Sequence, residues 1–343
     1  MTENAIHSGF PQDDERSVEP SIRPRTLGDF VGQGGAVGNL KTWIAAARSR
    51  GESLDHCLFS GPPGLGKTTL AYILAVEMGA AIRATSGPVL ARPRDLVGIL
   101  TNLQQGDILF IDEIHRIDAR VEEYLYTAME DFRISIIIDP GPHSRSVTLP
   151  LKHFTLVGAT TREGLLTPPL RGRFQIAERL DFYDPPELKA IILNSARKLN
   201  LDVDEEAAEL LARSSRGTPR VAIRYLRRVR DVAHASDAER ITPRIASDAL
   251  RRLGVDASGL CEMDRRILRY LAQCGGRPVG LKTVSIAVGE EVDTIEDVYE
   301  PFMIRLGLLE KTPRGRSLTR GGWEYLGCEP GAAPEDDQKP LFS

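Results

Sequence analysis

The sequence has few cysteines and no long apolar run. Its four cysteines are Cys57, Cys261, Cys274 and Cys328, and none of them belongs to a Cys-x-x-Cys pair. This spacing argues against a disulfide framework or a structural zinc site and favours a reducing compartment. No stretch approaches the roughly 18 apolar residues that span a membrane, and the start of the chain has acidic residues in place of a signal peptide's apolar segment. We therefore expect a cytoplasmic protein with no membrane contact.

The chain also lacks a strong excess of charge of either sign. Its net charge of −4 shows that it is no polycation, so any contact with nucleic acid has to be local. A hydrophobic fraction of 41% and a charged fraction of 27% are ordinary for a soluble globular protein. At roughly 100–200 residues per domain, 343 residues predict two or three domains. The polar ends, residues 1–20 and 328–343, are expected to be disordered tails.

Residues 21–183 alternate short apolar runs with helical patterns. The runs Cys57–Phe59, Ile108–Ile111 and Phe154–Gly158 are typical of buried parallel strands in a doubly wound α/β sheet. Ligands bind at the carboxyl ends of the strands in such sheets. A glycine-rich loop, an Asp-Glu pair and the segment Ala159–Arg162 each follow one of these runs, so we expect them to meet at one site.

The rest of the chain has different patterns of apolar residues. Residues 184–255 have no strand pattern, and their apolar residues recur at helical spacing, which predicts a small helical bundle. Residues 256–327 combine short helical patterns with the basic turn Thr312–Arg316. A helix-turn-helix followed by such a turn is the pattern of a winged helix.

The glycine-rich loop Gly61–Thr68 reads Gly-x-x-x-x-Gly-Lys-Thr, with a predicted strand before it and a predicted helix from Lys67 to about Met78 after it. Glycines let backbone N–H groups close around phosphates, and the helix N-terminus adds partial positive charge. We expect Lys67 to reach the β- and γ-phosphates of ATP and the Thr68 hydroxyl to bind Mg²⁺. The alternative is a glycine-rich turn that opens a helix. The residues expected to bind the nucleotide here are Gly64, Gly66, Lys67, Thr68 and Thr69.

The pair Asp112-Glu113 follows the second predicted strand. A carboxylate at a strand end beside a phosphate loop suits Mg²⁺, which is the role we assign to Asp112. Glu113 is expected to orient or deprotonate the attacking water, so that the chain is an ATP hydrolase. The alternative is a pair of acids that caps a helix. His115 is either a ligand or switch or simply a packed or exposed side chain, and the sequence leaves both open.

These motifs resemble those of the AAA+ ATPases and, within them, most closely the RuvB family, motors that drive branch migration of Holliday junctions. The resemblance covers about residues 20–327, and the Tyr-x-x-Met-Glu-Asp-Phe and Thr-Pro-Arg-Gly-Arg strings are its most specific parts. The matching strings are Ile22–Pro24, Phe30–Gln33, Leu54–His56, Thr85–Pro88, Ile108–Arg116, Tyr126–Phe132, Gly158–Arg162, Pro169–Phe174, Arg216–Arg220, Thr294–Val298 and Thr312–Arg316.

The resemblance implies roles for further residues around the nucleotide. Ile22 and Arg23 match an adenine site, and Thr160 and Thr161 lie where the family keeps its first sensor of the γ-phosphate. The positions implied to border the nucleotide or a subunit interface are Glu130, Asp131, Phe132 and Tyr183.

Two arginines match residues that the family places against phosphates. Arg220 matches the second sensor, and Arg173 matches an arginine finger supplied to a neighbouring subunit. Arginine suits both jobs because it stays charged and binds oxygens with a planar fork. The alternative for each is a surface salt bridge. A finger that acts on a neighbour implies a ring, and the resemblance implies a homohexamer around duplex DNA.

Residues 134–149 read as a hairpin whose isoleucines cannot all face one side of a strand. An exposed apolar hairpin suggests a partner site, and the alternative is a strand packed on its own sheet. The resemblance implies that a RuvA-like junction-binding protein docks there, with a RuvC-like resolvase as a further partner.

The basic turn carries Lys311, Arg314 and Arg316, which we expect to contact DNA phosphates in a salt-dependent and largely sequence-independent way. The alternative is a solvated basic hairpin. Relatives often have arginine at the positions of Val292 and Lys311, so Lys311 keeps the charge without the fork and Val292 loses the contact. Arg316 is the best-supported single contact.

The leading hypothesis is an ATP-driven ring motor that moves duplex DNA through Holliday junctions in recombination and repair. A clamp-loader subunit would share the ATPase motifs without needing a basic wing. A nucleotide-gated DNA-binding regulator would hydrolyse little ATP and read a preferred sequence.

Overall fold

The computed structural model describes residues 22–137 and 146–329. Contacts divide the chain into two units, Met1–Asn200 and Leu201–Ser343. The predicted tail at residues 1–20 and nearly all of the one at 328–343 lie outside the described residues, as does the turn of the predicted hairpin.

The first unit is built on five parallel strands in the order β2-β3-β6-β1-β7. Their bounds are β1 Cys57–Ser60, β2 Ile82–Ser86, β3 Ile108–Asp112, β6 Thr155–Thr160 and β7 Ile176–Arg179. The three central strands are the three predicted apolar runs, and every residue of β1 and β6 is buried. The edge strands β2 and β7 were not predicted because their sequences, such as Ile-Arg-Ala-Thr-Ser in β2, have no apolar run. The predicted parallel sheet is confirmed.

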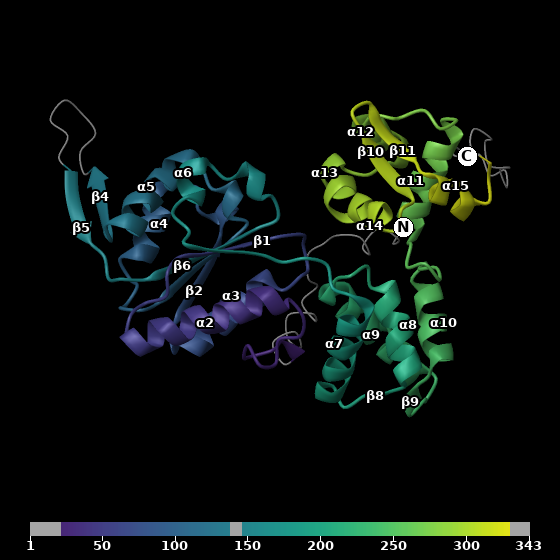
Figure 1. Cartoon of the computed structure of the whole chain (residues 1–343), viewed down its shortest axis with the longest axis horizontal. Coiled ribbons are helices and arrows are strands. Elements are labelled where there is room, and N and C mark those ends of the chain that lie inside the picture. Colours follow the sequence, from purple (N-terminus) through teal and green to yellow (C-terminus); the bar gives the residue numbers. More distant parts are fainter. Residues whose placement is uncertain (1–21, 138–145, 330–343) are drawn as a thin grey trace. The chain divides into compact units, whose positions relative to one another are not determined.

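Helices cover both faces of this sheet. Helices α2 and α3 lie on one face and α4 and α5 on the other (Figure 1). Leucines of α4 and α5 pack with residues of β3 and β6 into one apolar cluster. The bounds are α2 Gly34–Arg50, α3 Lys67–Met78, α4 Pro93–Leu100, α5 Ala119–Glu130, α6 Pro168–Arg171 and α7 Pro185–Lys198, with short turns of helix at η1 Gly87–Val89, η2 Ile114–Arg116 and η3 Glu163–Leu165. Helix α7, which begins the predicted helical region 184–255, clusters with this first unit.

The predicted hairpin forms a separate two-stranded antiparallel sheet, β4 Arg133–Ile137 with β5 Ser146–Pro150. Ile134 is fully buried against the core, whereas Val147, opposite Ile136, is 40% exposed. Ser135 and Thr148 pair on the other face through a hydroxyl–hydroxyl hydrogen bond of 2.9 Å. Ile134, Ile136 and Val147 therefore share one face of the hairpin, and the Ser135–Thr148 pair lies on the other.

The second unit begins with three helices and a short parallel pair of strands. We call α8–α10 the lid helices. Their bounds are α8 Glu205–Ser214, α9 Pro219–Ala235 and α10 Pro243–Arg252, with β8 Asp202–Val203 beside β9 Arg240–Ile241. Buried alanines and leucines at helical spacing pack these helices together, as the periodicity predicts.

A winged helix follows in the same unit, as predicted. Its β10 and β11 form the wing. An isolated antiparallel β-bridge between Val279 and Arg316 places Val279 beside β11. A separate apolar cluster that includes Leu268, Phe302 and Trp323 forms its core. The elements are α11 Glu262–Gln273, α12 Leu281–Val288, α13 Val292–Thr294, η4 Ile295–Tyr299, α14 Glu300–Arg305, β10 Leu309–Thr312, β11 Gly315–Leu318 and α15 Arg320–Leu326.

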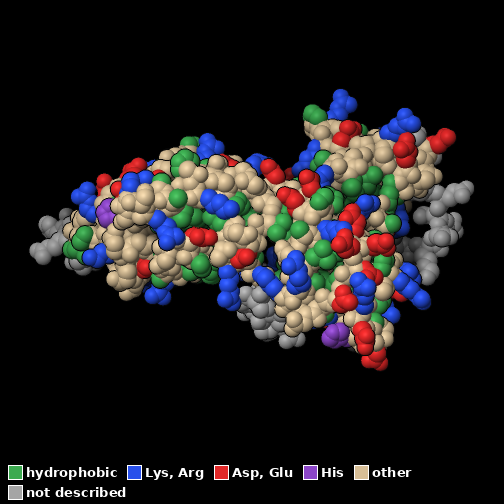
Figure 2. All heavy atoms as spheres, turned by 60° about the horizontal axis from the view of Figure 1, so that its bottom comes forward, with side chains coloured by type: hydrophobic (Ala, Val, Ile, Leu, Met, Phe, Trp, Pro, Cys, Tyr) green, Lys and Arg blue, Asp and Glu red, His purple; other side chains and the backbone are tan. Residues whose placement is uncertain are grey.

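Across the described ranges, every helix is too short or too polar to cross a membrane. Basic and acidic side chains are interspersed over the face shown in Figure 2, in line with the small net charge of −4.

Candidate nucleotide site and DNA-binding wing

The glycine loop connects β1 to α3 in a backbone conformation that suits glycine. Gly61 has φ 133° and Gly66 has φ 106°, both in the region that side chains disfavour. A Cβ on Gly61 would collide with the carbonyl oxygen of Leu180, and one on Gly66 would lie 3.0 Å from the Phe30 ring. Other segments of the same chain therefore pack against the loop on two sides. This packing fixes the directions of its N–H groups.

Lys67, the first residue of α3, folds back over this loop. Its Nζ donates hydrogen bonds to the carbonyl oxygens of Gly61 (2.6 Å) and Pro62 (2.8 Å), and the residue is 7% exposed. Burial lowers the pKa of the ammonium to about 8, against the opposing effect of the Glu113 and Asp112 carboxylates. A buried cation at the mouth of a phosphate loop is suited to an anionic ligand.

Asp112 ends β3 beside the first turn of α3. Its Oδ1 accepts the Glu113 N–H at 3.0 Å, and its carboxylate also accepts the Thr68 hydroxyl. Burial, and after it the Glu113 carboxylate, raises the pKa of Asp112. A hydroxyl and a carboxylate in contact are the hard oxygen donors that Mg²⁺ uses, so the residues present fit that ion.

Glu113 adopts a left-handed conformation (φ 47°) and turns its carboxylate toward the end of β6. Its Oε2 accepts the Thr161 hydroxyl at 3.1 Å and lies 3.2 Å from His115 Nδ1. The same ring nitrogen lies 2.9 Å from the hydroxyl of the fully buried Thr160. The ends of β3 and β6 therefore bring together an acid, an imidazole and two hydroxyls.

Of the interpretations left open for His115, the structure supports the packed side chain, which lies within this group. Its side chain is only 7% exposed. The sequence carries only a weak signal for this contact. His115 lies on η2, two residues after Glu113, and no other feature of the sequence indicates that its ring is near the carboxylate. A Cβ on Gly87 would collide with the Glu113 carbonyl, which accounts for a glycine in the segment after β2.

The residues expected near the adenine and the loop lie together in the first unit. Lys198 of α7 donates to the carbonyl oxygens of Ile22 (3.1 Å) and Arg23 (3.4 Å), and Ile22 is 4% exposed. The Tyr183 hydroxyl donates to the Leu65 carbonyl at 3.0 Å. These contacts fix the chain on either side of the glycine loop.

Arg173 lies just after α6 and is held by neighbours within its own chain. Its Nη1 donates to the Pro169 carbonyl at 2.7 Å, and its Nη2 lies 3.1 Å from the Glu130 carboxylate. The guanidinium stacks on the Tyr126 ring at 4.3 Å, and its Nε is buried without a hydrogen-bond partner among the described residues. Two residues expected at a subunit interface, Glu130 and Arg173, are thereby brought into contact.

The other two residues of that implied interface take different positions. Asp131 pairs with Arg133 at 3.7 Å. Phe132 has φ 50°, and its ring centroid lies 4.0 Å from that of His153 at the base of the hairpin. Arg220 belongs to the second unit, where it is exposed in the first turn of α9.

The three basic side chains of the wing differ in exposure and in ion pairing. Arg314 is exposed at the turn between β10 and β11. Arg316 is 15% exposed and pairs with the buried Glu300 carboxylate through its Nε at 2.6 Å and its Nη2 at 3.1 Å. Lys311 pairs with the same Glu300 at 2.9 Å and with Glu296 at 3.1 Å.

The pairing with Glu300 was missed in the sequence. Glu300 lies on α14, 16 positions before Arg316, so no short pattern connects the two. Val292, at the position where relatives often have arginine, is half-buried at the start of α13.

Comparison with known proteins agrees with this arrangement along the whole described chain. Three family profiles match in succession: the Holliday junction DNA helicase RuvB P-loop domain over residues 22–180, the RuvB AAA lid domain over 183–256 and the RuvB C-terminal winged helix domain over 257–327.

Full-length relatives match as well. The Holliday junction branch migration complex subunit RuvB of Myxococcus xanthus is 56% identical over 319 residues, which cover 93% of each chain. The protein of the same description from Chlorobaculum tepidum is 55% identical over 90% of each chain. The solved structure of the Thermotoga maritima RuvB Holliday junction branch migration motor has a TM-score of 0.82 at 46% identity and covers 90% of this chain and 99% of that one. The chain therefore belongs to the RuvB family of AAA+ ATPases.

Proposed function

We propose that this chain, an ATP-driven branch-migration motor of the RuvB family, hydrolyses Mg-ATP at the loop Gly61–Thr68 and uses the cycle to move duplex DNA. The observation that carries this proposal is the group at the strand ends: Lys67 on the loop, Asp112 against Thr68, and Glu113 held by Thr161. A clamp-loader subunit or a sequence-reading regulator is set aside, because all three profiles that match are those of RuvB domains.

Each residue has a role that follows from its contacts. The loop N–H groups and Lys67 bind the phosphates, with Lys67 exchanging two carbonyl partners for phosphate oxygens. Thr68 and Asp112 hold Mg²⁺, which neutralises charge on the phosphates when bound. The remaining residues proposed to contact the nucleotide are Ile22, Arg23, Gly64, Gly66, Thr69 and Tyr183.

The hydrolytic step is assigned to Glu113. Its carboxylate accepts a proton from, or aligns, the water that attacks the γ-phosphate. The hydrogen bond from Thr161 fixes the direction of the carboxylate. His115 contacts both Glu113 and Thr160, so it connects the base to the sensor segment.

Arg173 is proposed to act on the ATP of a neighbouring subunit, with Glu130, Asp131 and Phe132 at the same interface. Its stacking on Tyr126 holds the guanidinium, and its buried Nε has an unused donor. Arg220 is proposed to report on the γ-phosphate from the lid. A finger supplied to a neighbour requires a closed ring, for which we propose a homohexamer.

The winged helix is proposed to follow the DNA backbone. Arg314 at the tip is exposed and is proposed to reach a phosphate, while Arg316, which bonds Glu300 through its Nε and Nη2, is proposed to contact a phosphate beside it. Lys311 adds charge beside it. The apolar face of the hairpin 134–149 is proposed to dock a RuvA-like junction-binding protein, and a RuvC-like resolvase is proposed as a further partner of the assembly.

The ATPase assignment is tested by steady-state hydrolysis with and without four-way junction DNA. Glu113→Gln and Lys67→Ala are expected to abolish turnover, whereas the exposed control Glu52→Gln keeps it. Normal hydrolysis by either site variant would refute the assignment.

The trans role of Arg173 is tested by mixing two inactive proteins, Arg173→Ala and Lys67→Ala. In mixed rings, a Lys67→Ala subunit can lend its intact finger to an Arg173→Ala neighbour, so part of the activity should return. No recovery in rings shown to contain both subunits would count against action in trans.

A further inference from the structure

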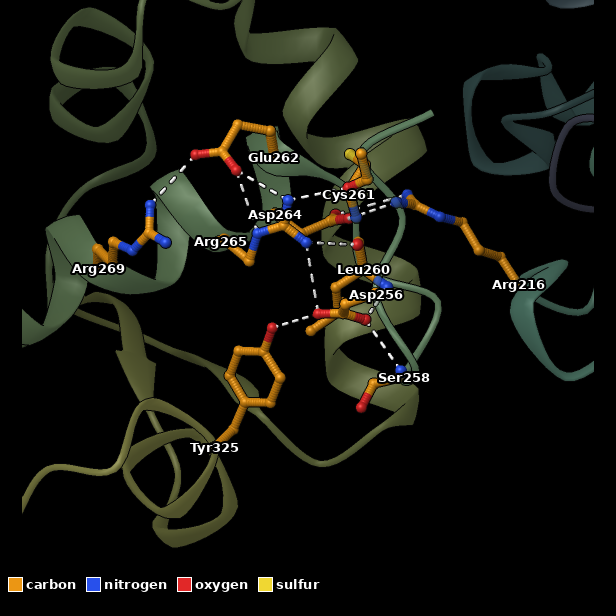
Figure 3. Close-up of polar contacts among 11 residues, drawn as sticks. Arg216, Asp256, Ser258, Leu260, Cys261, Glu262, Asp264, Arg265, Arg269 and Tyr325 are labelled. Carbon is orange, nitrogen blue, oxygen red and sulfur yellow. Dashed lines mark hydrogen bonds and ion pairs between the residues drawn. The ribbon is translucent and has the colours of Figure 1, made fainter. Parts of the chain in front are cut away.

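The turn between α8 and α9 is joined to the winged helix by a buried ion pair. Arg216, at φ 56° in this turn, directs both Nη atoms at the two carboxylate oxygens of Asp264 on α11, with Nη1 3.4 Å from Oδ1 and Nη2 bonded to Oδ2 (Figure 3). The Asp264 side chain is 0% exposed and that of Arg216 10%. This is the fork geometry in which arginine binds a carboxylate at two points.

The winged helix surrounds this pair on its other sides. Asp264 Oδ2 also accepts the Cys261 N–H at 2.7 Å at the start of α11. The Phe302 ring of α14 lies under the guanidinium of Arg216 at 5.1 Å. A Cβ on Gly217 would collide with the guanidinium of Arg305, so the turn packs against that side chain of α14.

The connection from α10 to α11 is also bonded along its length. The Asp256 carboxylate accepts the N–H groups of Ser258 and Leu260, each at 2.9 Å, and bonds with the Tyr325 hydroxyl of α15 (Figure 3). Arg265 donates to the Gly254 carbonyl at 2.8 Å and contacts Asp256 at 3.5 Å. The lid helices and the winged helix are therefore connected at two places, and neither connection is a loose linker.

Apolar side chains would hold such a junction at least as stably, because removing two charges from water is costly. What a two-point ion pair adds is a single allowed orientation. The elements that Arg216 connects are the ones the motor has to couple. Helix α9 begins three residues after it and carries Arg220, and α14 leads directly into β10, which carries Lys311.

We propose that Arg216 is a positioning residue of the motor, whose two-point pair with Asp264 transmits movement of α9 to the DNA-binding wing. The inference rests on the proposed function. With the pair in place, a rotation of the lid helices rotates the wing by the same angle. Without it, ATP is still hydrolysed but part of the movement is lost between the two domains.

The experiment measures ATP hydrolysed per base pair of branch migration on a synthetic four-way junction. Arg216→Lys keeps the charge and removes the fork. Its ATP turnover and DNA affinity are expected to stay within about twofold of wild type, while ATP consumed per base pair rises about tenfold. The exposed Arg213→Met on α8, which breaks only a surface pair with Glu209, should have the wild-type ratio.

A second variant separates coupling from folding. Arg216→Met with Asp264→Asn leaves no unpaired charge, fills the space and keeps an oxygen for the Cys261 N–H. It should unfold at close to the wild-type temperature and still consume more ATP per base pair. A wild-type ratio in a folded double variant would overturn the proposal. Failure of the wild-type protein to migrate junctions at all would instead overturn the proposed function.

Discussion

At the scale of single residues, hydrogen bonds within the chain hold the key side chains of the nucleotide site. Lys67 is bonded to two loop carbonyls, and Glu113 is bonded to Thr161. Both side chains are therefore oriented by partners within the chain. Binding ATP then replaces partners that are already in position, which limits the ordering cost.

The depressed pKa of Lys67 predicts a pH-dependent affinity for ATP. Without nucleotide the ammonium has a pKa of about 8, so it loses its proton as pH rises above that value. Phosphates favour the charged form, so affinity should be full well below pH 8, decline through pH 8 and fall by up to about tenfold per unit above it. Binding near pH 8 should also take up a proton, which calorimetry in buffers of different ionisation enthalpy detects. Constant affinity from pH 7 to 9 would show that Lys67 does not make the contact.

The hydrogen bond from Thr161 predicts a selective loss of catalysis. Thr161→Val removes the donor that orients the Glu113 carboxylate. We expect kcat to fall about 10- to 100-fold with little change in the Kd for ATP, since alignment of a general base is worth that order. The exposed Thr42→Val on α2 is the matched control. Equal losses in Kd and kcat would place Thr161 in binding instead.

At the scale of elements, nearby residues of the hairpin and of the wing have different surroundings. On the hairpin, Val147 and Thr148 are neighbours that point to opposite faces. Val147→Asp should weaken binding of a RuvA-like partner by about tenfold or more, because it puts a charge on the apolar face. Thr148→Asp should bind normally. Pull-down or surface binding assays give the comparison, and equal affinities would remove the hairpin face as the docking site.

On the wing, Arg314 and Arg316 should respond differently to truncation. Arg314→Ala removes an exposed charge, so the slope of log affinity for duplex DNA against log salt should decrease by about 1 while stability is unchanged. Arg316→Ala leaves Glu300 with Lys311 as its remaining partner and should cost about 2–3 kcal/mol in the free energy of unfolding. Fluorescence anisotropy and urea unfolding measure the two effects. Equal stability of the two variants would contradict the structural role of the pair with Glu300.

At the scale of the whole molecule, the sequence predicts what depends on local patterns. The glycine loop, the strands β1, β3 and β6 and the order of the domains follow from motifs and apolar runs. The edge strands do not, because their stability comes from pairing with the central strands. The contacts of His115 with Thr160 and of Arg316 with Glu300 were missed for a related reason: they are set by how separate segments pack, and no short pattern encodes them.

Within the second unit, the lid helices and the winged helix are also joined by a contact between separate segments. Arg216 and Asp264 are 48 positions apart, and the string Arg216–Arg220 does not indicate a partner on α11. The ATPase motifs can therefore be read from the sequence, whereas the ion pair between the lid helices and the winged helix is visible only in the folded chain.

The central claim is that ATP hydrolysis at Glu113 drives movement of DNA through a junction. The most direct measurement is branch migration of a synthetic four-way junction by the full chain, with ATP, with a RuvA-like partner added or left out. We expect ATP-dependent conversion of the junction, strengthened by the partner and absent with Glu113→Gln. Conversion at the same rate by Glu113→Gln, or ATP hydrolysis with no conversion even when the partner is present, would refute the claim.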